Sequence, residues 1–185
     1  MSLRWLPNAI CLVRVLLVAP LVAALLAGRY ELALVLLVIA GGSDGLDGFL
    51  AKRFGWHTRL GSLLDPAADK LLIGSVFLTL TWLGHVPLLL AAIVIARDAV
   101  IVLGSMAYHV LIEPIRGEPA AISKLNTACQ LGFVLFALTT AAYRWPGDAV
   151  LVPLGAAVVF TSITSGLTYV LRWSRRAWRA AHASA

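Results

Sequence analysis

The sequence predicts an all-α integral membrane protein with six transmembrane helices. Of its 185 residues, 61% are hydrophobic, and the mean hydropathy is +0.90. Those values are too apolar for a soluble domain of this size. Only 13% of the residues are charged, so each charge inside an apolar segment requires its own explanation. The net charge of +6 is concentrated at segment ends and in the tail, which favours contact with anionic lipid headgroups over nucleic acid.

Six apolar segments are each long enough to cross a bilayer, which takes about 20 residues. The connections between them are short and polar, and no soluble domain, low-complexity linker or internal repeat is visible. We therefore expect one membrane domain over residues 1–185, ending in a basic aromatic tail at 172–185. The expected spans are Ile10–Gly28, Leu32–Lys52, Leu63–Leu83, Pro87–Ile112, Ser123–Ala142 and Ala149–Leu171.

Lysine and arginine are distributed unevenly between the two ends of these spans. Only Arg29 and Arg144 fall at one end, and this bias predicts that both termini and the 52–62 loop are cytoplasmic. The basic tail is interpreted in two ways, as an orientation signal with interfacial anchors or as a docking segment for anionic lipid. The cations at the other end are Arg4, Arg14, Lys52, Arg53, Arg59, Arg116, Lys124, Arg172, Arg175, Arg176 and Arg179.

Four aspartates, Asp44, Asp47, Asp65 and Asp69, lie within segments otherwise suited to lipid. The first two are three residues apart and the last two are four apart, so each pair shares one face of a helix. The short loop between the two helices allows them to pack as neighbours, and the four carboxylates can then converge. Clustered carboxylates repel one another unless cations lie among them. Because oxygen ligands suit hard cations, we expect two bound Mg2+ or Mn2+ ions.

The spacing of these residues resembles the signature of the CDP-alcohol phosphotransferase family. It reads D-x2-D-G-x2-A, then a basic residue, then G-x3-D-x3-D, over Asp44, Asp47, Gly48, Ala51, Lys52, Gly61, Asp65 and Asp69. The family usually has Arg after the Ala, where this chain has Lys52 followed by Arg53.

Other segments extend the resemblance over nearly the whole chain. PNAICLVR looks like the family's PNxxTxxR element, with Pro7, Asn8 and Arg14 matching and Cys11 in place of Thr. The ARD at residues 96–98 and ISKLNTACQL at 122–131 resemble the branch that includes eukaryotic-type cardiolipin synthases. They resemble phosphatidylglycerophosphate synthases less closely.

The resemblance implies an enzyme that transfers the phosphatidyl group of CDP-diacylglycerol to an acceptor hydroxyl and releases CMP. Phosphatidylglycerol is the preferred acceptor, which would give cardiolipin, and glycerol 3-phosphate is the alternative. The resemblance also implies a homodimer among membrane lipids. The four aspartates are the implied metal ligands, and Asp69 is also the implied catalytic base. The implied nucleotide-binding residues are Asn8, Arg14, Gly48, Lys52 and Gly61.

The sequence predicts the acceptor site less specifically than it predicts the aspartate site. Arg97, Arg116 and Lys124 are candidates for binding a phosphate on the acceptor, because charges inside a membrane bundle are functional candidates. For Arg97 the alternative is that it and Asp98 pair with partners in the bundle and only hold helices together.

A small divalent-cation transporter is the competing class of protein, because ion pathways are also built from acidic residues. Transport would need acids along a path through the bilayer, whereas here they gather at one side. We expect a multi-pass protein of a bacterial inner membrane with its site facing the cytoplasm, since the chain starts directly at its first span. A mitochondrial inner membrane is the alternative, although no transit peptide is visible.

Overall fold

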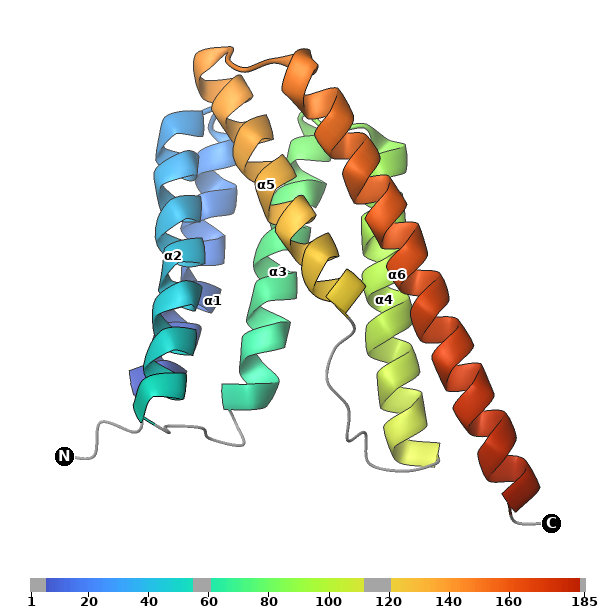
Figure 1. Cartoon of the computed structure of the whole chain (residues 1–185). Helices are drawn as coiled ribbons and strands as arrows, with labels where there is room; N and C mark the ends of the chain where they lie inside the picture. Colours follow the sequence, from blue (N-terminus) through green and yellow to red (C-terminus); the bar gives the residue numbers. More distant parts are fainter. Residues whose placement is uncertain (1–5, 55–60, 112–120, 184–185) are drawn as a thin grey trace. The chain divides into compact units, whose positions relative to one another are not determined.

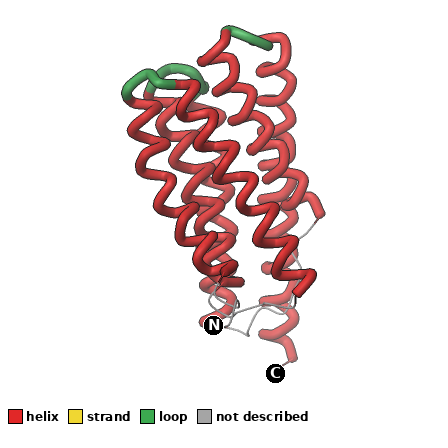
Figure 2. Tube along the Cα trace, turned by 90° about the vertical axis from the view of Figure 1, so that its left-hand side faces the viewer, coloured by secondary structure: helices red, strands yellow, loops and turns green. Residues whose placement is uncertain are grey.

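The computed structural model is helical in every element that it describes, over backbone residues 6–54, 61–111 and 121–183 (Figures 1 and 2). Side chains are described for residues 9–43, 68–104, 121–172 and 174. The predicted all-α class is confirmed. The helices within these ranges are α1 (Leu6–Leu26), α2 (Tyr30–Phe54), α3 (Gly61–Trp82), α4 (Leu88–Leu111), α5 (Ala121–Tyr143) and α6 (Asp148–Ala183).

Three of these helices are long and apolar enough to cross a membrane, judged by the described residues. The segments are Ala9–Leu26 of α1, Ala121–Tyr143 of α5 and Asp148–Arg172 of α6. In α2 the apolar stretch Tyr30–Ser43 is shorter. The three remaining helices, α2, α3 and α4, are those that carry the acidic pairs and the Arg97–Asp98 pair. The fold is thus that of a membrane protein, and six crossings remain a prediction.

The chain divides by its internal contacts into two units. Unit 1 consists of Met1–Val86 and Val134–Asp148, and unit 2 of Pro87–Phe133 and Ala149–Ala185. Helix α5 therefore contributes its C-terminal half to unit 1 and its N-terminal half to unit 2.

In unit 1, helix α1 packs against both α2 and α3. Leucines at helical spacing on α1, Leu21 and Leu25, are fully buried, as are Leu37 of α2 and Phe77 of α3. Figure 1 shows that α1 and α3 run in one direction and α2 in the other, so the start of α1, the end of α2 and the start of α3 lie at the same end of the unit. That end carries the sequence motifs with the aspartates.

Two glycines end helices of unit 1 in the same way. Gly28 and Gly84 have φ of 71° and 77°, a left-handed conformation that glycine adopts without steric cost. At the first, the amide of Arg29 donates to the carbonyl of Ala24 and that of Gly28 to Leu25; the amides of His85 and Gly84 repeat the pattern at the end of α3. These are Schellman motifs, which satisfy the last carbonyl groups of each helix. They give the sharp turns after α1 and α3.

In unit 2 a glycine allows three helices to approach closely. A Cβ added at Gly155 of α6 would lie 3.1 Å from Cδ1 of Leu90 on α4 and 3.4 Å from Cε2 of Phe133 on α5. Small residues permit such close backbone approach in membrane bundles, where apolar burial by itself does not drive helices together. Gly155 therefore helps to set the packing of α4, α5 and α6.

Helix α6 is longer than the predicted sixth span. It runs 36 residues, from Asp148 to Ala183, or about 54 Å at 1.5 Å per residue. The hydrocarbon core of a bilayer is about 30 Å thick. The basic segment after Leu171, expected as a separate tail, thus continues the helix. It is rich in Ala and Arg and contains no Gly or Pro before residue 184, so its helix propensity is high.

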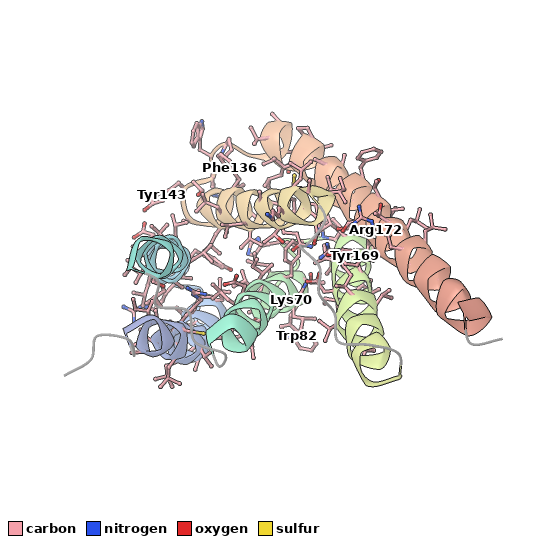
Figure 3. The ribbon with its side chains drawn as sticks, turned by 60° about the horizontal axis from the view of Figure 1, so that its bottom comes forward. Lys70, Trp82, Phe136, Tyr143, Tyr169 and Arg172 are labelled. Atoms are coloured by element: carbon pink, nitrogen blue, oxygen red, sulfur yellow. The ribbon has the colours of Figure 1, made fainter. Side chains whose placement is uncertain are left out.

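Large exposed aromatic rings lie where two helices of unit 1 end. The side chain of Trp82 at the end of α3 is 85% exposed and that of Tyr143 at the end of α5 is 57% exposed (Figure 3). Trp and Tyr concentrate at membrane–water interfaces, where part of the ring meets lipid and its polar edge meets water. These rings indicate where the surface of a membrane would lie at the end of α3 remote from the acidic motif.

Candidate active site

The two acidic pairs lie on helix ends that unit 1 brings to one side. Asp44 and Asp47 are in the C-terminal half of α2, and Asp65 and Asp69 are in the N-terminal half of α3, with the start of α1 at the same end (Figure 1). Of the four carboxylates only that of Asp69 is among the described side chains, so their convergence stays a prediction. The predicted site residues whose side chains lie outside the described ranges are Asn8, Asp44, Asp47, Gly48, Lys52, Gly61, Asp65 and Arg116.

Asp69 is held by an arginine of the first helix. Nη1 of Arg14 donates to Oδ1 of Asp69 at 2.8 Å, and the two side chains are 0% and 34% exposed, respectively. Each residue is eight positions after the start of its helix, about 12 Å along the axis. Helices α1 and α3 pack together and run in the same direction. Two residues at the same distance from the starts of these helices therefore lie beside each other.

This contact shows two features of Arg14 and Asp69 that the sequence did not predict. Arg14, one of the cations at the predicted cytoplasmic ends of the spans, is completely buried and contacts α3. The sequence also gave no sign that Asp69 has a cationic partner 55 residues earlier in the chain. The nucleotide-binding role that the resemblance implies for Arg14 stays a prediction.

The predicted donor set fits a divalent cation by its chemistry. Asp69 pairs with Arg14 through Oδ1, and about a third of its side chain is exposed, so the carboxylate can offer an oxygen to a ligand. Three more carboxylates on α2 and α3 would complete a set made only of hard oxygen donors, which suits Mg2+ or Mn2+. The residues that would hold such ions are the four aspartates of the motif.

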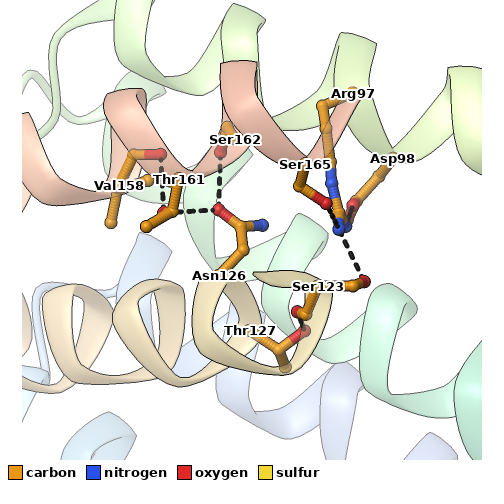
Figure 4. Close-up of polar contacts among 9 residues, drawn as sticks. All are labelled: Arg97, Asp98, Ser123, Asn126, Thr127, Val158, Thr161, Ser162 and Ser165. Atoms are coloured by element: carbon orange, nitrogen blue, oxygen red, sulfur yellow. Dashed lines mark hydrogen bonds and ion pairs between the residues drawn. The ribbon is translucent and has the colours of Figure 1, made fainter. Parts of the chain in front are cut away.

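In unit 2, Arg97 of α4 lies at the centre of a network of polar contacts (Figure 4). Its Nη1 donates to Oδ1 of Asp98 at 2.6 Å, and its Nη2 donates to the hydroxyls of Ser123 at 2.7 Å and Ser165 at 2.5 Å. The side chains of Arg97 and Asp98 are 4% and 19% exposed. One guanidinium thereby links α4 to α5 and α6, which supports the structural alternative for Arg97 over phosphate binding.

A second group of buried polar contacts lies between α5 and α6. The carbonyl oxygen of Asn126 accepts hydrogen bonds from the hydroxyls of Thr161 and Ser162, each at 2.8 Å (Figure 4). Nδ2 of Asn126 and Nε2 of Gln130, one turn further along α5, have no hydrogen-bond partner within the described residues. Buried donors of this kind bind the oxygen atoms of water or of a polar ligand. The sequence did not predict polar contacts for Thr161, Ser162 and Ser165 of α6. Their segment TSITS is nevertheless unusually polar for an apolar helix.

Lys124 differs from Arg97 in its surroundings. It follows Ser123 on α5, and its side chain is exposed. It is therefore accessible to a ligand in a way that Arg97 is not.

The described part of the chain is all helical, with apolar helices of membrane-spanning length and paired aspartates on two helices of unit 1, which is the architecture of a membrane protein with a candidate acidic site. Comparison with known proteins specifies this class further. Residues 4–170 match the CDP-alcohol phosphatidyltransferase family, which covers both acidic pairs, Arg14 and the Arg97 network. The chain belongs to this family of transferases.

Its relatives include two kinds of phospholipid-forming enzyme. It is 31% identical to the CMP-forming cardiolipin synthase of Rattus norvegicus over 88% of this chain and 59% of that protein. With the human protein of the same name it is 30% identical over 88% of this chain and 60% of that protein. It is 34% identical to a chloroplastic CDP-diacylglycerol–glycerol-3-phosphate 3-phosphatidyltransferase of Oryza sativa over 72% of this chain and 46% of that protein. The chain spans about three fifths of the cardiolipin synthases.

Proposed function

We propose that the protein transfers the phosphatidyl group of CDP-diacylglycerol to a glycerol-type hydroxyl and releases CMP. The observation that carries the proposal is the family match over residues 4–170, which includes all four aspartates. The relatives' names support both the lipid donor and the release of CMP.

Phosphatidylglycerol is the proposed acceptor, so that the product is cardiolipin. The support is the extent of similarity: the match to rat cardiolipin synthase covers 88% of this chain, whereas the match to the rice glycerol-3-phosphate transferase covers 72%. Glycerol 3-phosphate, which would give phosphatidylglycerophosphate, is the alternative. In either reaction the acceptor oxygen bonds to the lipid phosphorus, and the bond from that phosphorus to the CMP oxygen breaks.

Asp69 is the proposed general base that takes the acceptor's proton. Its carboxylate is partly exposed, and the hydrogen bond from Arg14 orients it. Two divalent cations, when bound, would supply positive charge that neutralises the diphosphate and stabilises the departing CMP. Asp44, Asp47, Asp65 and Asp69 are the residues proposed to hold them.

Lys124 is proposed to bind a phosphate on the acceptor. Its side chain is exposed and is therefore accessible to a ligand. Arg116, outside the described residues, is a further candidate for a phosphate. A homodimer in the membrane, which the resemblance implies, stays a prediction that cross-linking in lipid would test.

The choice of acceptor is tested with purified protein in detergent–lipid micelles. Labelled CDP-diacylglycerol is supplied with phosphatidylglycerol alone or with glycerol 3-phosphate alone, and lipid products and CMP are measured. We expect cardiolipin and CMP with phosphatidylglycerol, and loss of both products when a chelator removes divalent cations. A product only with glycerol 3-phosphate would reverse the choice of acceptor.

The same protein in liposomes tests the competing class. A divalent-cation transporter would carry metal ions across the bilayer without releasing CMP. A transferase would release CMP and would not carry metal ions across the bilayer. Metal flux without CMP release would replace the proposed function with transport.

We further propose six crossings of a bacterial cytoplasmic membrane with the acidic end in the cytoplasm. Single cysteines test this in a chain whose two free cysteines, Cys11 and Cys129, are replaced by Ala. Ala27→Cys lies in the turn after α1 and Ser174→Cys in the basic part of α6, and both positions are exposed. With a membrane-impermeant maleimide on intact cells, we expect the cysteine at position 27 to be labelled and the cysteine at position 174 to stay unlabelled. Position 174 should become labelled once the membrane is permeabilised. The reverse pattern would invert the topology.

A further inference from the structure

The ion pair between Arg14 and Asp69 distinguishes two possible roles for the arginine. A residue that binds the substrate's diphosphate must reach it, and the side chain of Arg14 is 0% exposed. The accessible member of the pair is Asp69, which is 34% exposed. The geometry therefore presents the carboxylate to a ligand and places the guanidinium behind it.

We infer that Arg14 is a positioning residue for Asp69 and does not bind the nucleotide diphosphate directly. This inference rests on the proposed function, in which Asp69 takes the acceptor's proton. A carboxylate on a helix has several rotamers, and a charge-assisted hydrogen bond of 2.8 Å to one oxygen selects one of them. The burial of Arg14 between packed helices fixes the donor, so the acceptor oxygen is fixed with it.

The helix geometry explains how Arg14 reaches Asp69. Arg14 and Asp69 are at equal depth on two packed helices that run in the same direction. The arginine is therefore matched to the acid in the proposed base role.

Arg14→Gln and Arg14→Lys test the inference through kcat and KM. For Arg14→Gln we expect kcat to fall by about 100-fold, the effect of a misplaced reacting group. KM for CDP-diacylglycerol and the Kd of CMP should stay within about twofold, because ground-state binding is unchanged. Arg14→Lys keeps the charge and should recover most of the lost kcat. Arg29→Gln, which removes an exposed arginine from the turn after α1, is the matched control and should behave as wild type.

Each alternative role gives a different result. A raised KM and a weakened Kd for CMP, with kcat preserved, would show that Arg14 binds the nucleotide and would overturn the inference. Unchanged kcat and KM in Arg14→Gln would show that the pair only supports the fold, and this result would also overturn the inference.

The pair itself is tested without reference to activity. Thermal unfolding of Arg14→Gln, Asp69→Asn and the double variant forms a double-mutant cycle. We expect coupling: the double variant should lose less stability than the sum of the losses in the two single variants. Additive losses of stability would overturn the inference. If the wild-type protein released no CMP with any acceptor, the proposed function would fail, while this cycle would still decide whether the pair forms.

Discussion

Replacing Asp69 by Asn is expected to abolish turnover while CMP still binds. The amide has the shape of the carboxylate and can still accept a hydrogen bond from Arg14, but it cannot take a proton. General base catalysis contributes about 100- to 10,000-fold to rate, and kcat should fall by a factor in that range. The measurement is CMP release under saturating substrates, with CMP affinity determined separately.

Asp148→Asn is the matched control for this variant. It makes the same chemical change at an exposed aspartate in the first turn of α6, and activity should stay at the wild-type level. Full activity of Asp69→Asn would remove Asp69 from the base role. Loss of CMP binding together with turnover would instead assign it chiefly to holding the metal ions and the nucleotide.

The second large effect concerns the stability of unit 2. Arg97→Met keeps an unbranched apolar stem but removes the guanidinium group, and with it the ion pair with Asp98 and two hydrogen bonds to serines of α5 and α6. Removing one partner of a buried ion pair destabilises a protein by about 3–5 kcal/mol. At roughly 2–4 °C per kcal/mol for a chain of this size, the thermal midpoint in detergent should fall by about 10 °C. Adding Asp98→Asn should restore part of the loss, since the carboxylate is then uncharged.

Lys124→Gln is the comparison that separates stability from acceptor binding. It removes an exposed charge from α5, and such surface changes usually alter stability by less than about 0.5 kcal/mol. If Lys124 binds the acceptor, KM for the acceptor should rise with the thermal midpoint unchanged. If Arg97→Met also raised KM for the acceptor without loss of stability, Arg97 would be shown to bind phosphate. That result would contradict its role in holding α4, α5 and α6 together.

Local sequence patterns predicted the helices well, because helix formation and apolar length depend on neighbouring residues. The predicted starts and ends of the spans lie within about four residues of the observed helices for α1 to α5. The exception is the end of α6, which continues to Ala183. The predicted sixth span ends at Leu171 because the apolar run ends there, whereas the helix needs only residues that favour helical backbone.

The candidate site was predicted in part. The motif placed the two acidic pairs on consecutive helices, and the structure puts those helix ends on one side of unit 1 (Figure 1). It did not reveal the partners of the arginines. Arg14 pairs across 55 residues, and Arg97 bonds to serines 26 and 68 residues away. Such pairings depend on the rotation and depth of one helix against another.

By itself, the sequence determined that this protein is helical, that it is apolar enough for a membrane and that its aspartates form two helical pairs. Those properties follow from composition and from spacing within single helices. Only the tertiary structure decided that Arg14 lies buried behind Asp69 and that Arg97 joins three helices. The physical reason is that a charge removed from water must find its counterpart wherever helix packing brings one, and packing joins residues that are distant in the chain.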